Sequence, residues 1–323
     1  MRALVLGGAG FIGLHLTRRL LADGHSVTLV DDFSRGRDDR ELAAIRPRVQ
    51  VFQADLTSAA AYDGLPHGWD QVYLLAAVVG VRNVERDPAR VLRVNTLALL
   101  HLLDWLHPGE RLFFASTSET YAGTVSAGLA PVPTAEEVPL LIEDVAAPRF
   151  AYAVSKLWGE AAVLHTARAR ELECVVGRFH NVYGPRMGAD HVIPELSLRA
   201  IGREDPFRVY GVEQSRAFCH VDDAVEAMVR LMSSDQATGQ IVHIGNDTEP
   251  TGVGDLAELV LRVAGFAPAL QPLPAPPGSV AQRCPDITKL RALTGFEPKV
   301  SLEEGVRHTF EWYRDDRWYR DDR

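Results

Sequence analysis

The chain has 323 residues, of which 46% are hydrophobic and 24% are charged, and its formal net charge is −9. This length and composition suit a globular protein with a large core, and the acidic balance argues against a surface for nucleic acid or anionic membranes. We expect neither a membrane span nor a secretory signal, because no apolar stretch has the required length or pattern. The three cysteines lack metal-type spacing, and we expect them to be reduced thiols of a cytoplasmic protein: Cys174, Cys219 and Cys284.

The N-terminus predicts a strand, a glycine-rich turn and a helix. Residues 3–6 are an apolar run typical of a buried parallel strand, and residues 11–22 repeat apolar side chains at helical spacing. Between and within them stand Gly7, Gly10 and Gly13, with Phe11 and Ile12 opening the helix. Glycines at this junction permit a tight turn and a close approach of a pyrophosphate to the helix start, so the pattern predicts a dinucleotide site.

The second predicted strand, residues 27–30, leads into Asp31 and Asp32. An acid at the end of this strand is placed to accept hydrogen bonds from a ribose 2′-hydroxyl, which favours NAD over NADP. Arg35 and Arg37 follow closely and leave pairing with a 2′-phosphate as the alternative.

Strands and helices alternate further along the chain. Strands are predicted at 49–53, 71–75, 111–115, 173–178 and 240–243, and helices at 88–106 and 152–170. The alternation predicts an α/β fold of the Rossmann type, a doubly wound parallel sheet. We expect an NAD-binding domain over 1–178 with a return around 218–248. Proline and glycine become frequent after residue 180, which predicts a smaller, loop-rich substrate lobe over 179–217 and 249–311. The repeated segment 312–323 is expected to be a surface tail.

The strand at 111–115 ends in polar residues that include Thr117, Ser118 and Glu119. Ligands bind at the carboxyl ends of strands in such sheets, so Thr117 is a candidate to hold a substrate hydroxyl and Glu119 to transfer or position a proton. The alternative is a polar turn with a helix-capping acid.

Tyr152 and Lys156 stand four residues apart on a predicted helix and therefore share one face. A phenol has a pKa of roughly 10, and a neighbouring ammonium lowers it, so the pair is a candidate general base. An exposed tyrosine and a solvated lysine are the alternative. The scattered His180, His191 and His220 lack ligand spacing, and we expect no metal site.

Together these segments resemble the extended short-chain dehydrogenases/reductases that act on nucleotide sugars. The likeness rests on residues 7–13, Ser116 to Glu119 and Tyr152 to Lys156, and it continues through 178–186, 215–223 and 283–286. The resemblance implies tightly bound NAD, with Asp55 and Leu56 near adenine, Asn95 near the nicotinamide half, and Tyr152 and Lys156 on its ribose. It implies that Asn181, Arg186, Arg216 and Arg283 bind the substrate, and that helices 88–106 and 152–170 form a homodimer interface.

Within this family the chain is most similar to UDP-glucuronate decarboxylases. Thr117-Ser118-Glu119, Asn181 to Met187 and Arg283 to Ile287 fit that branch. The segment 78–82 departs from its usual substrate loop, and Arg82 in this segment is a candidate partner for a substrate carboxylate. The expected reaction passes through a 4-keto sugar and gives a UDP-4-keto-pentose or UDP-xylose. A UDP-sugar 4-epimerase, a 4,6-dehydratase and a non-catalytic nucleotide-binding protein remain alternatives.

Overall fold

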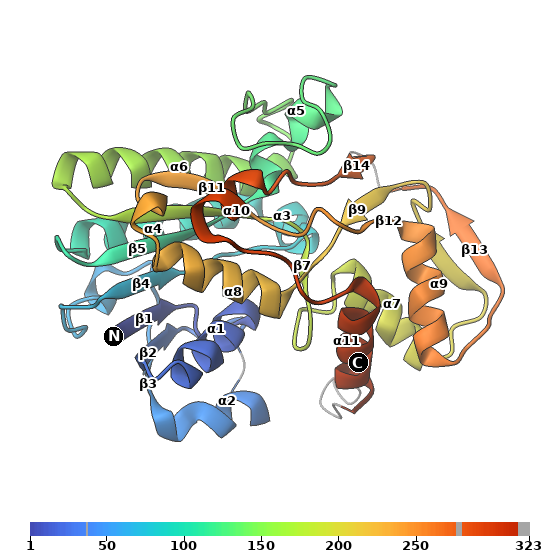
Figure 1. Ribbon diagram of the computed structural model, residues 1–323, viewed down its shortest axis with the longest axis horizontal. Coiled ribbons are helices and arrows are strands. Elements are labelled where there is room, and N and C mark those ends of the chain that lie inside the picture. The colour runs from blue at the N-terminus through green and yellow to red at the C-terminus, as the bar shows by residue number, and fades with distance from the viewer. Residues whose placement is uncertain (37, 276–279, 316–323) are drawn as a thin grey trace.

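A computed structural model describes residues 1–36, 38–275 and 280–315. Its centre is a seven-stranded, all-parallel sheet with the spatial order β11-β6-β5-β4-β1-β2-β3. The strands are β1 (Arg2–Leu6), β2 (Ser26–Asp31), β3 (Val49–Gln53), β4 (Gln71–Leu74), β5 (Arg111–Thr117), β6 (Cys174–Phe179) and β11 (Gln240–Ile244). All seven predicted strands are therefore present, and the expected doubly wound Rossmann fold is confirmed (Figure 1).

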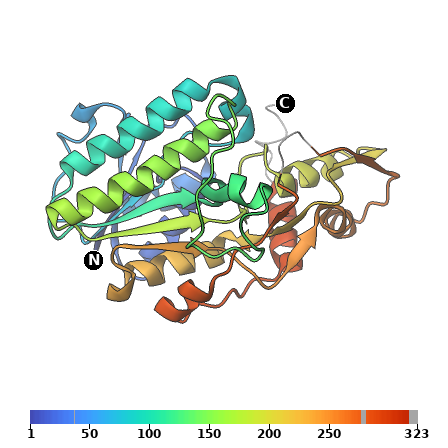
Figure 2. The ribbon, with the colours of Figure 1, turned by 90° about the horizontal axis from the view of Figure 1, so that it is seen from above.

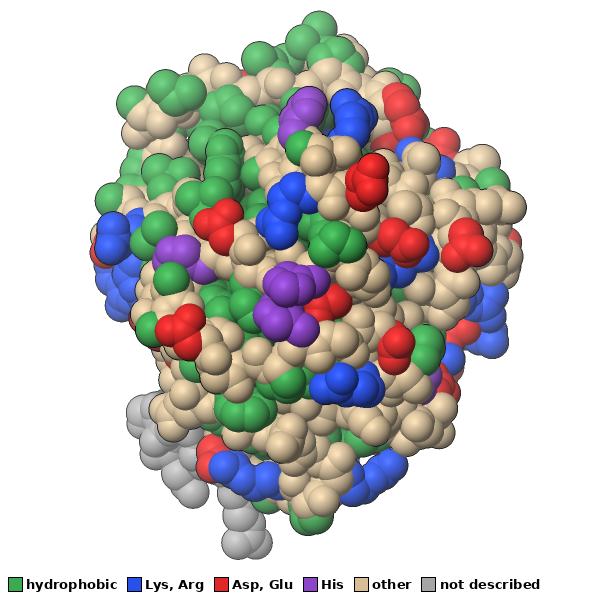
Figure 3. All heavy atoms as spheres, turned by 90° about the vertical axis from the view of Figure 1, so that its left-hand side faces the viewer, with side chains coloured by type: hydrophobic (Ala, Val, Ile, Leu, Met, Phe, Trp, Pro, Cys, Tyr) green, Lys and Arg blue, Asp and Glu red, His purple; other side chains and the backbone are tan. Residues whose placement is uncertain are grey.

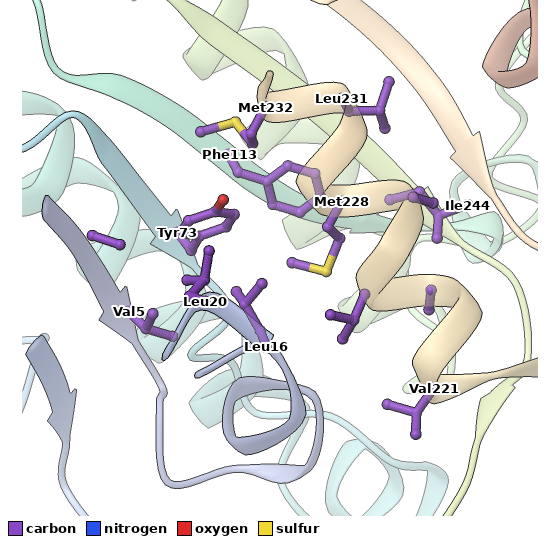
Figure 4. Close-up of a cluster of buried hydrophobic side chains, with 14 of the residues drawn as sticks. Val5, Leu16, Leu20, Tyr73, Phe113, Val221, Met228, Leu231, Met232 and Ile244 are labelled. Atoms are coloured by element: carbon purple, nitrogen blue, oxygen red, sulfur yellow. The ribbon is translucent and has the colours of Figure 1, made fainter. Parts of the chain in front are cut away.

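Helices cover both faces of the sheet. On one face α1 (Phe11–Ala22) and α8 (Val221–Met232) pack side by side, and their apolar side chains interlock with those of the sheet, as Leu16, Met228 and Phe113 do in Figure 4. On the other face lie α4 (Pro88–Trp105) and α6 (Phe150–Arg170), which run next to each other in Figure 2. The two buried clusters make the sheet a rigid support for the loops at its carboxyl edge.

Short helices and strands connect these layers or lie at their edges. They are α2 (Arg40–Ile45), α3 (Val81–Arg86), α5 (Ala122–Ser126) and α10 (Thr288–Thr294), together with β7 (Val182–Tyr183) and β10 (Cys219–His220), which pair with each other.

The second lobe, on the right of Figure 1, has more regular structure than the sequence indicated. Its helices are α7 (Val192–Ile201), α9 (Val253–Ala264) and α11 (Leu302–Asp315). Its strands are β8 (Phe207–Tyr210), β9 (Ser215–Ala217), β12 (Pro250–Gly252), β13 (Leu270–Leu273) and β14 (Gln282–Arg283). These helices share a core around Leu196, Leu256 and Val306, so the expectation of a loop-rich lobe is corrected. Frequent prolines and glycines punctuate the connections, while helical periodicity continues between them.

The expected surface tail from residue 312 is also corrected for its described part. Residues 312–315 are the last turn of α11, and Tyr313 is fully buried beside Leu198. The rest of that prediction, 316–323, lies outside the described residues, as does Arg37.

No helix among the described residues is long and apolar enough to cross a membrane. On the side where the N-terminus lies, Figure 3 shows acidic and basic side chains interspersed.

Candidate active site

A cleft of about 2400 Å³ runs along the carboxyl edge of the sheet and reaches the second lobe. Its lining comes from the loops after β1, β2, β4 and β5, from α6, and from the segments around Arg186 and Arg283. The carboxyl edge of a doubly wound sheet is the usual place for a ligand. This single cleft receives most of the side chains that the sequence singled out.

The glycine-rich turn after β1 has no room for side chains. Gly7 has φ +89°, and an added Cβ there would lie 2.6 Å from the backbone nitrogen of Ala76. A Cβ on Gly13 would collide with the carbonyl oxygen of Gly7. The backbone of the turn and the start of α1, including Gly10, Phe11 and Ile12, therefore line the cleft directly. A compact cradle with exposed amides at a helix start suits a pyrophosphate.

Asp31 is buried at the end of β2 and organises this cradle. Its carboxylate accepts hydrogen bonds from the amide of Ala9 at 2.9 Å and from that of Phe33 at 2.9 Å. Burial raises the pKa of Asp31, although both hydrogen bonds oppose the rise. Gly36, which sequence reasoning missed, packs over this carboxylate, and a Cβ there would lie 2.6 Å from its Oδ1. The signal for Gly36 was its position a few residues after the acid.

The rest of the adenosine end is formed by side chains at the ends of β2 and β3. Asp32 is exposed and caps the amide of Ser34, while Asp55 and Leu56 line the cleft beyond β3. The guanidinium of Arg35 donates to the carbonyl of Val79 at 2.9 Å.

Arg186 comes from the second lobe but binds the glycine-rich turn. Its guanidinium donates to the carbonyls of Ala9 at 2.8 Å and Gly10 at 3.0 Å, and to Asp39 at 2.7 Å. The sequence grouped Arg186 with the substrate residues. The geometry favours a different role, in which this buried side chain holds the dinucleotide turn against the second lobe.

Asn95 on α4 lies behind the cleft. Its side chain exchanges hydrogen bonds with the backbone of Val78, at 2.8 and 3.3 Å, and donates to Ser155 at 3.1 Å. It is not among the cleft-lining residues and instead fixes the segment 78–82. Arg82 does not line the cleft either: it pairs with Asp190 at 2.9 Å, and its side chain is 79% exposed.

Tyr152 and Lys156 do share one face of α6 and line the cleft with Thr117. Burial raises the pKa of the Tyr152 phenol, the charge of Glu119 raises it further, and interactions with Thr117 and Arg35 lower it. Lys156 donates to the carbonyl of Ala115 at 2.7 Å, and its nitrogen lies 6.0 Å from the centre of the Tyr152 ring. The groups that lower the pKa of the phenol are therefore Thr117 and Arg35, and not Lys156 as their spacing had indicated.

Glu119 follows Thr117 and Ser118 in a 3₁₀ turn and meets a group of arginines. Arg283 donates to its carboxylate at 2.6 Å, and Arg216 lies opposite Arg283 in register on the neighbouring strand. Burial raises the pKa of Glu119, but the charges of Arg283, Arg149 and Arg216 outweigh it and leave the pKa below its usual value. Glu119 is therefore an ionised group at neutral pH.

The same arginines make this end of the cleft electropositive. Burial and the charge of Arg283 lower the pKa of Arg216 to about 10. Asn181 supports the group by donating to the carbonyl of Ala217 at 2.9 Å. Arg149, which sequence reasoning missed, lines the cleft three residues before Tyr152, and this i,i+3 spacing on a helix was the available signal.

Among the described residues no group of histidines, cysteines and acids could hold a metal ion. His180, His191 and His220 belong to different parts of the fold, and His180 instead bonds the hydroxyl of Tyr121 at 2.8 Å.

A Rossmann sheet, a glycine cradle with an acid at the end of β2, and a Tyr-Lys pair beside it define a dinucleotide-dependent short-chain dehydrogenase/reductase with a second lobe. Residues 3–245 match the NAD dependent epimerase/dehydratase family, and the chain belongs to that family.

Relatives by sequence are sugar-nucleotide decarboxylases. The chain is 32% identical to UDP-N-acetyl-alpha-D-glucosaminuronate decarboxylase of Bacillus cytotoxicus, over 97% of this chain and 98% of that one. It is 33% identical to UDP-glucuronic acid decarboxylase 1 of Xenopus tropicalis, over 98% of this chain and 72% of that one.

A solved structure gives the same fold with a different activity. UDP-glucose 4-epimerase of Thermotoga maritima, crystallised with UDP-glucose, superposes with a TM-score of 0.84 at 30% identity, over 97% of this chain and 99% of that one.

Proposed function

We propose that this protein is an NAD-dependent decarboxylase of a UDP-linked uronate, with UDP-glucuronate as the first candidate substrate. The observation that carries the proposal is the ionised Glu119 beside Tyr152, surrounded by arginines that suit a polyanionic substrate. The decarboxylase relatives, which cover nearly the whole chain, support the same activity.

The residues of the cleft fit NAD. The cradle around Gly7 and Gly13 admits a pyrophosphate only because it lacks side chains. Asp31 favours NAD over NADP, since a 2′-phosphate beside its carboxylate meets repulsion. Asp32, Asp55 and Leu56 would flank the adenosine, and Tyr152 and Lys156 the ribose of the other half. Bound NAD supplies an oxidant that accepts hydride from C4 of the sugar, and its positively charged ring lowers the pKa of a neighbouring phenol.

The chain's own residues then manage protons and position the sugar. Tyr152 as phenolate takes the proton from the sugar O4, while Thr117 holds that oxygen. A ketone at C4 stands β to the carboxylate carbon, so loss of CO₂ breaks the bond to C5 and leaves an enolate. Solvent supplies the proton that the enolate takes up at C5, and Glu119, with Ser118, aligns the sugar for that transfer. Return of the hydride to C4, with Tyr152 returning the proton to O4, gives the UDP-pentose, and earlier release of the ketone gives the UDP-4-keto-pentose.

The charges of the site match those of a uronate. Arg216 and Arg283 lie next to each other in register, an arrangement that suits a diphosphate, because a planar guanidinium matches phosphate oxygens. Arg149 lines the cleft one helical turn before Tyr152 and is therefore a better candidate for the substrate carboxylate than the exposed Arg82, which does not line it.

The test is to incubate the purified protein with NAD and UDP-glucuronate and follow the products by mass spectrometry. Loss of the mass of CO₂ is expected, and the ratio of keto to reduced pentose identifies the last step. UDP-N-acetylglucosaminuronate is assayed in parallel, because one relative acts on that sugar. Inertness toward both uronates would overturn the proposal.

A 4-epimerase is the second candidate, because the Thermotoga maritima structure has that activity on the same fold. An epimerase would give a new isomer of unchanged mass in the same assay. Because epimerisation at C4 involves no proton transfer at C5, it would leave Glu119 without a role there.

We further propose a cytoplasmic homodimer that pairs α4 and α6 with their copies. Leu92 and Leu100, two turns apart on α4, are each 38% exposed and supply apolar side chains for the dimer interface. The three cysteines are free and buried, which supports a reducing compartment. The mass in solution, compared with that of Leu92→Glu, tests the dimer.

A further inference from the structure

Side chains in the first half of α6 contact three successive residues of β5, Ala115, Ser116 and Thr117. Lys156 donates to the carbonyl of Ala115 at 2.7 Å, and the hydroxyl of Ser116 donates to Glu160 at 2.5 Å. Thr117, the next residue, interacts with Tyr152. Tyr152, Lys156 and Glu160 are spaced by four, so they form one row on the helix face that meets the strand.

Glu160 is the one member of this row that the proposed reaction does not use. Arg178 on β6, opposite Ser116 in register, donates to both of its oxygens, at 2.8 and 2.7 Å. The side chains of Arg178 and Glu160 are only 2% and 4% exposed, and Arg178 also donates to the carbonyl of Glu136 at 3.0 Å. A guanidinium that donates to both oxygens of a carboxylate fixes that carboxylate in place.

This buried ion pair lies beside a buried lysine. The groups around Lys156 are Tyr152 and Glu160 on its own helix and Phe114 on β5, with its ring 4.8 Å from the nitrogen, while Arg178 on β6 reaches this group through Glu160. Glu119 lies beyond Tyr152. Burial lowers the pKa of Lys156 to about 8, and the charge of Glu160 opposes that fall.

We propose that Glu160, held by Arg178 and Ser116, is a positioning residue that keeps Lys156 protonated in the cleft at neutral pH. The catalytic significance of that proton rests on the role proposed above for Lys156, but the coupling itself does not. A protonated Lys156 is a charged hydrogen-bond donor both to Ala115 and to a ribose hydroxyl, whereas a neutral amine binds both more weakly.

The two partners of the ion pair should act on Lys156 with opposite sign. Glu160→Gln removes the negative charge and leaves Arg178, so the titration midpoint of Lys156 falls by about one pH unit or more. Arg178→Gln removes the positive charge and leaves Glu160, so the midpoint rises. A merely structural role would move both variants in the same direction, because both lose hydrogen bonds of the same pair.

The chain offers a direct measurement, because it has only three lysines, Lys156, Lys289 and Lys299. Lysine labelled with ¹³C at Cε gives three NMR signals whose pH titrations are followed separately. Lys289 and Lys299, which lie elsewhere in the fold, serve as internal references, and Lys156→Arg assigns the remaining signal.

Two matched controls separate charge from packing. Glu160→Asp keeps the carboxylate and should leave the midpoint of Lys156 close to that of the wild type. Ser116→Ala removes one hydrogen bond but no charge and should do the same. A midpoint in Ser116→Ala that falls as far as in Glu160→Gln would overturn the proposal.

A titration of the wild type alone, or of either variant alone, is enough to test the proposal. A wild-type midpoint of Lys156 below pH 7 would overturn the proposal even if neither variant folded, because the lysine would then be neutral at neutral pH. If only Arg178→Gln folds, its midpoint must rise above the wild-type value. The titration needs no substrate, so it stands or falls separately from the decarboxylase assay. In active protein, NAD affinity in Glu160→Gln should weaken as pH rises from 6 to 8, while that of Glu160→Asp should not.

Discussion

Glu119 accepts a hydrogen bond from Arg283 at 2.6 Å, and this ion pair joins the turn after β5 to the second lobe. The carboxylate belongs to the loop that carries Thr117, and the guanidinium belongs to the strand pair that includes Arg216. This one ion pair therefore contributes both to the contact between the two lobes and to the charge of the candidate reaction site. An anionic substrate that draws Arg283 to its phosphates would release Glu119 to act at the sugar.

Glu119→Gln should separate oxidation from decarboxylation. The amide keeps the size of the side chain but has no charge to hold Arg283 and align the sugar, so the bond to the carboxylate carbon is poorly oriented for loss of CO₂, while Tyr152 and Thr117 still start the reaction. We expect CO₂ release to fall about 100-fold or more while an NADH absorbance still forms in a single turnover. Glu137→Gln is the control, since Glu137 pairs with Lys289 at the surface. Unchanged turnover in Glu119→Gln would refute the role of this acid.

Arg149→Gln should weaken binding of a uronate selectively. Loss of a charge-assisted contact to the sugar carboxylate predicts a KM for UDP-glucuronate roughly tenfold or more above the wild-type value. The dissociation constant of UDP-glucose, which lacks the carboxylate, should stay the same. Arg82→Gln is the matched control and should change neither value, because Arg82 is exposed and paired with Asp190. Equal losses for both sugars in Arg149→Gln would show that Arg149 supports the fold or the nucleotide instead.

The elements of this fold could be predicted from the sequence because their signals are local. The glycine-rich turn, the acid at the end of β2 and the Tyr-Lys spacing each lie within a few residues. Contacts between distant segments could not be predicted in this way. Arg186 holds Gly10 from 176 residues away, and Lys156 turns to the carbonyl of Ala115 on a strand that only the folded sheet brings near. The site was therefore predictable as a set of residue types, but the partners of Arg186, Asn95 and Lys156 were not.

Turnover should rise with pH across the neutral range. Burial and Glu119 raise the pKa of the Tyr152 phenol, so at pH 7 most of the protein carries the protonated, inactive form. Each unit of pH below the pKa of a general base changes its active fraction about tenfold, so log(kcat/KM) should climb from pH 6 toward 8. Tyr152→Phe should lower kcat/KM about 1000-fold and remove this dependence. A flat wild-type profile would mean that another group, or another step, limits the reaction.

Gly13→Ala should abolish binding of NAD. The new Cβ collides with the carbonyl oxygen of Gly7 and forces the start of α1 away from the turn. Titration calorimetry with NAD should give no measurable heat, whereas Gly64→Ala, a position with open space around its Cβ, should bind like the wild type. Normal affinity in Gly13→Ala would place the dinucleotide elsewhere.

Two buried histidines should make the fold sensitive to acid. His180 and His243 lie with ring centres 4.6 Å apart, each has one ring nitrogen without a partner in the described structure, and both are fully buried. Burial lowers the pKa of His243 from 6.5 to about 3. The unfolded chain therefore takes up a proton below pH 6.5 that the folded protein refuses, so stability falls as pH drops from 6.5 toward 3. Each such group lowers the free energy of unfolding by about 1.4 kcal/mol per pH unit in that window.

Urea unfolding at pH 7, 6 and 5 should show this decline in the free energy of unfolding, and the decline should be less steep in His243→Phe than in the wild type. His165→Gln, at an exposed site, is the control and should follow the wild type. Equal slopes in His243→Phe and the wild type would show that His243 takes no part in acid unfolding.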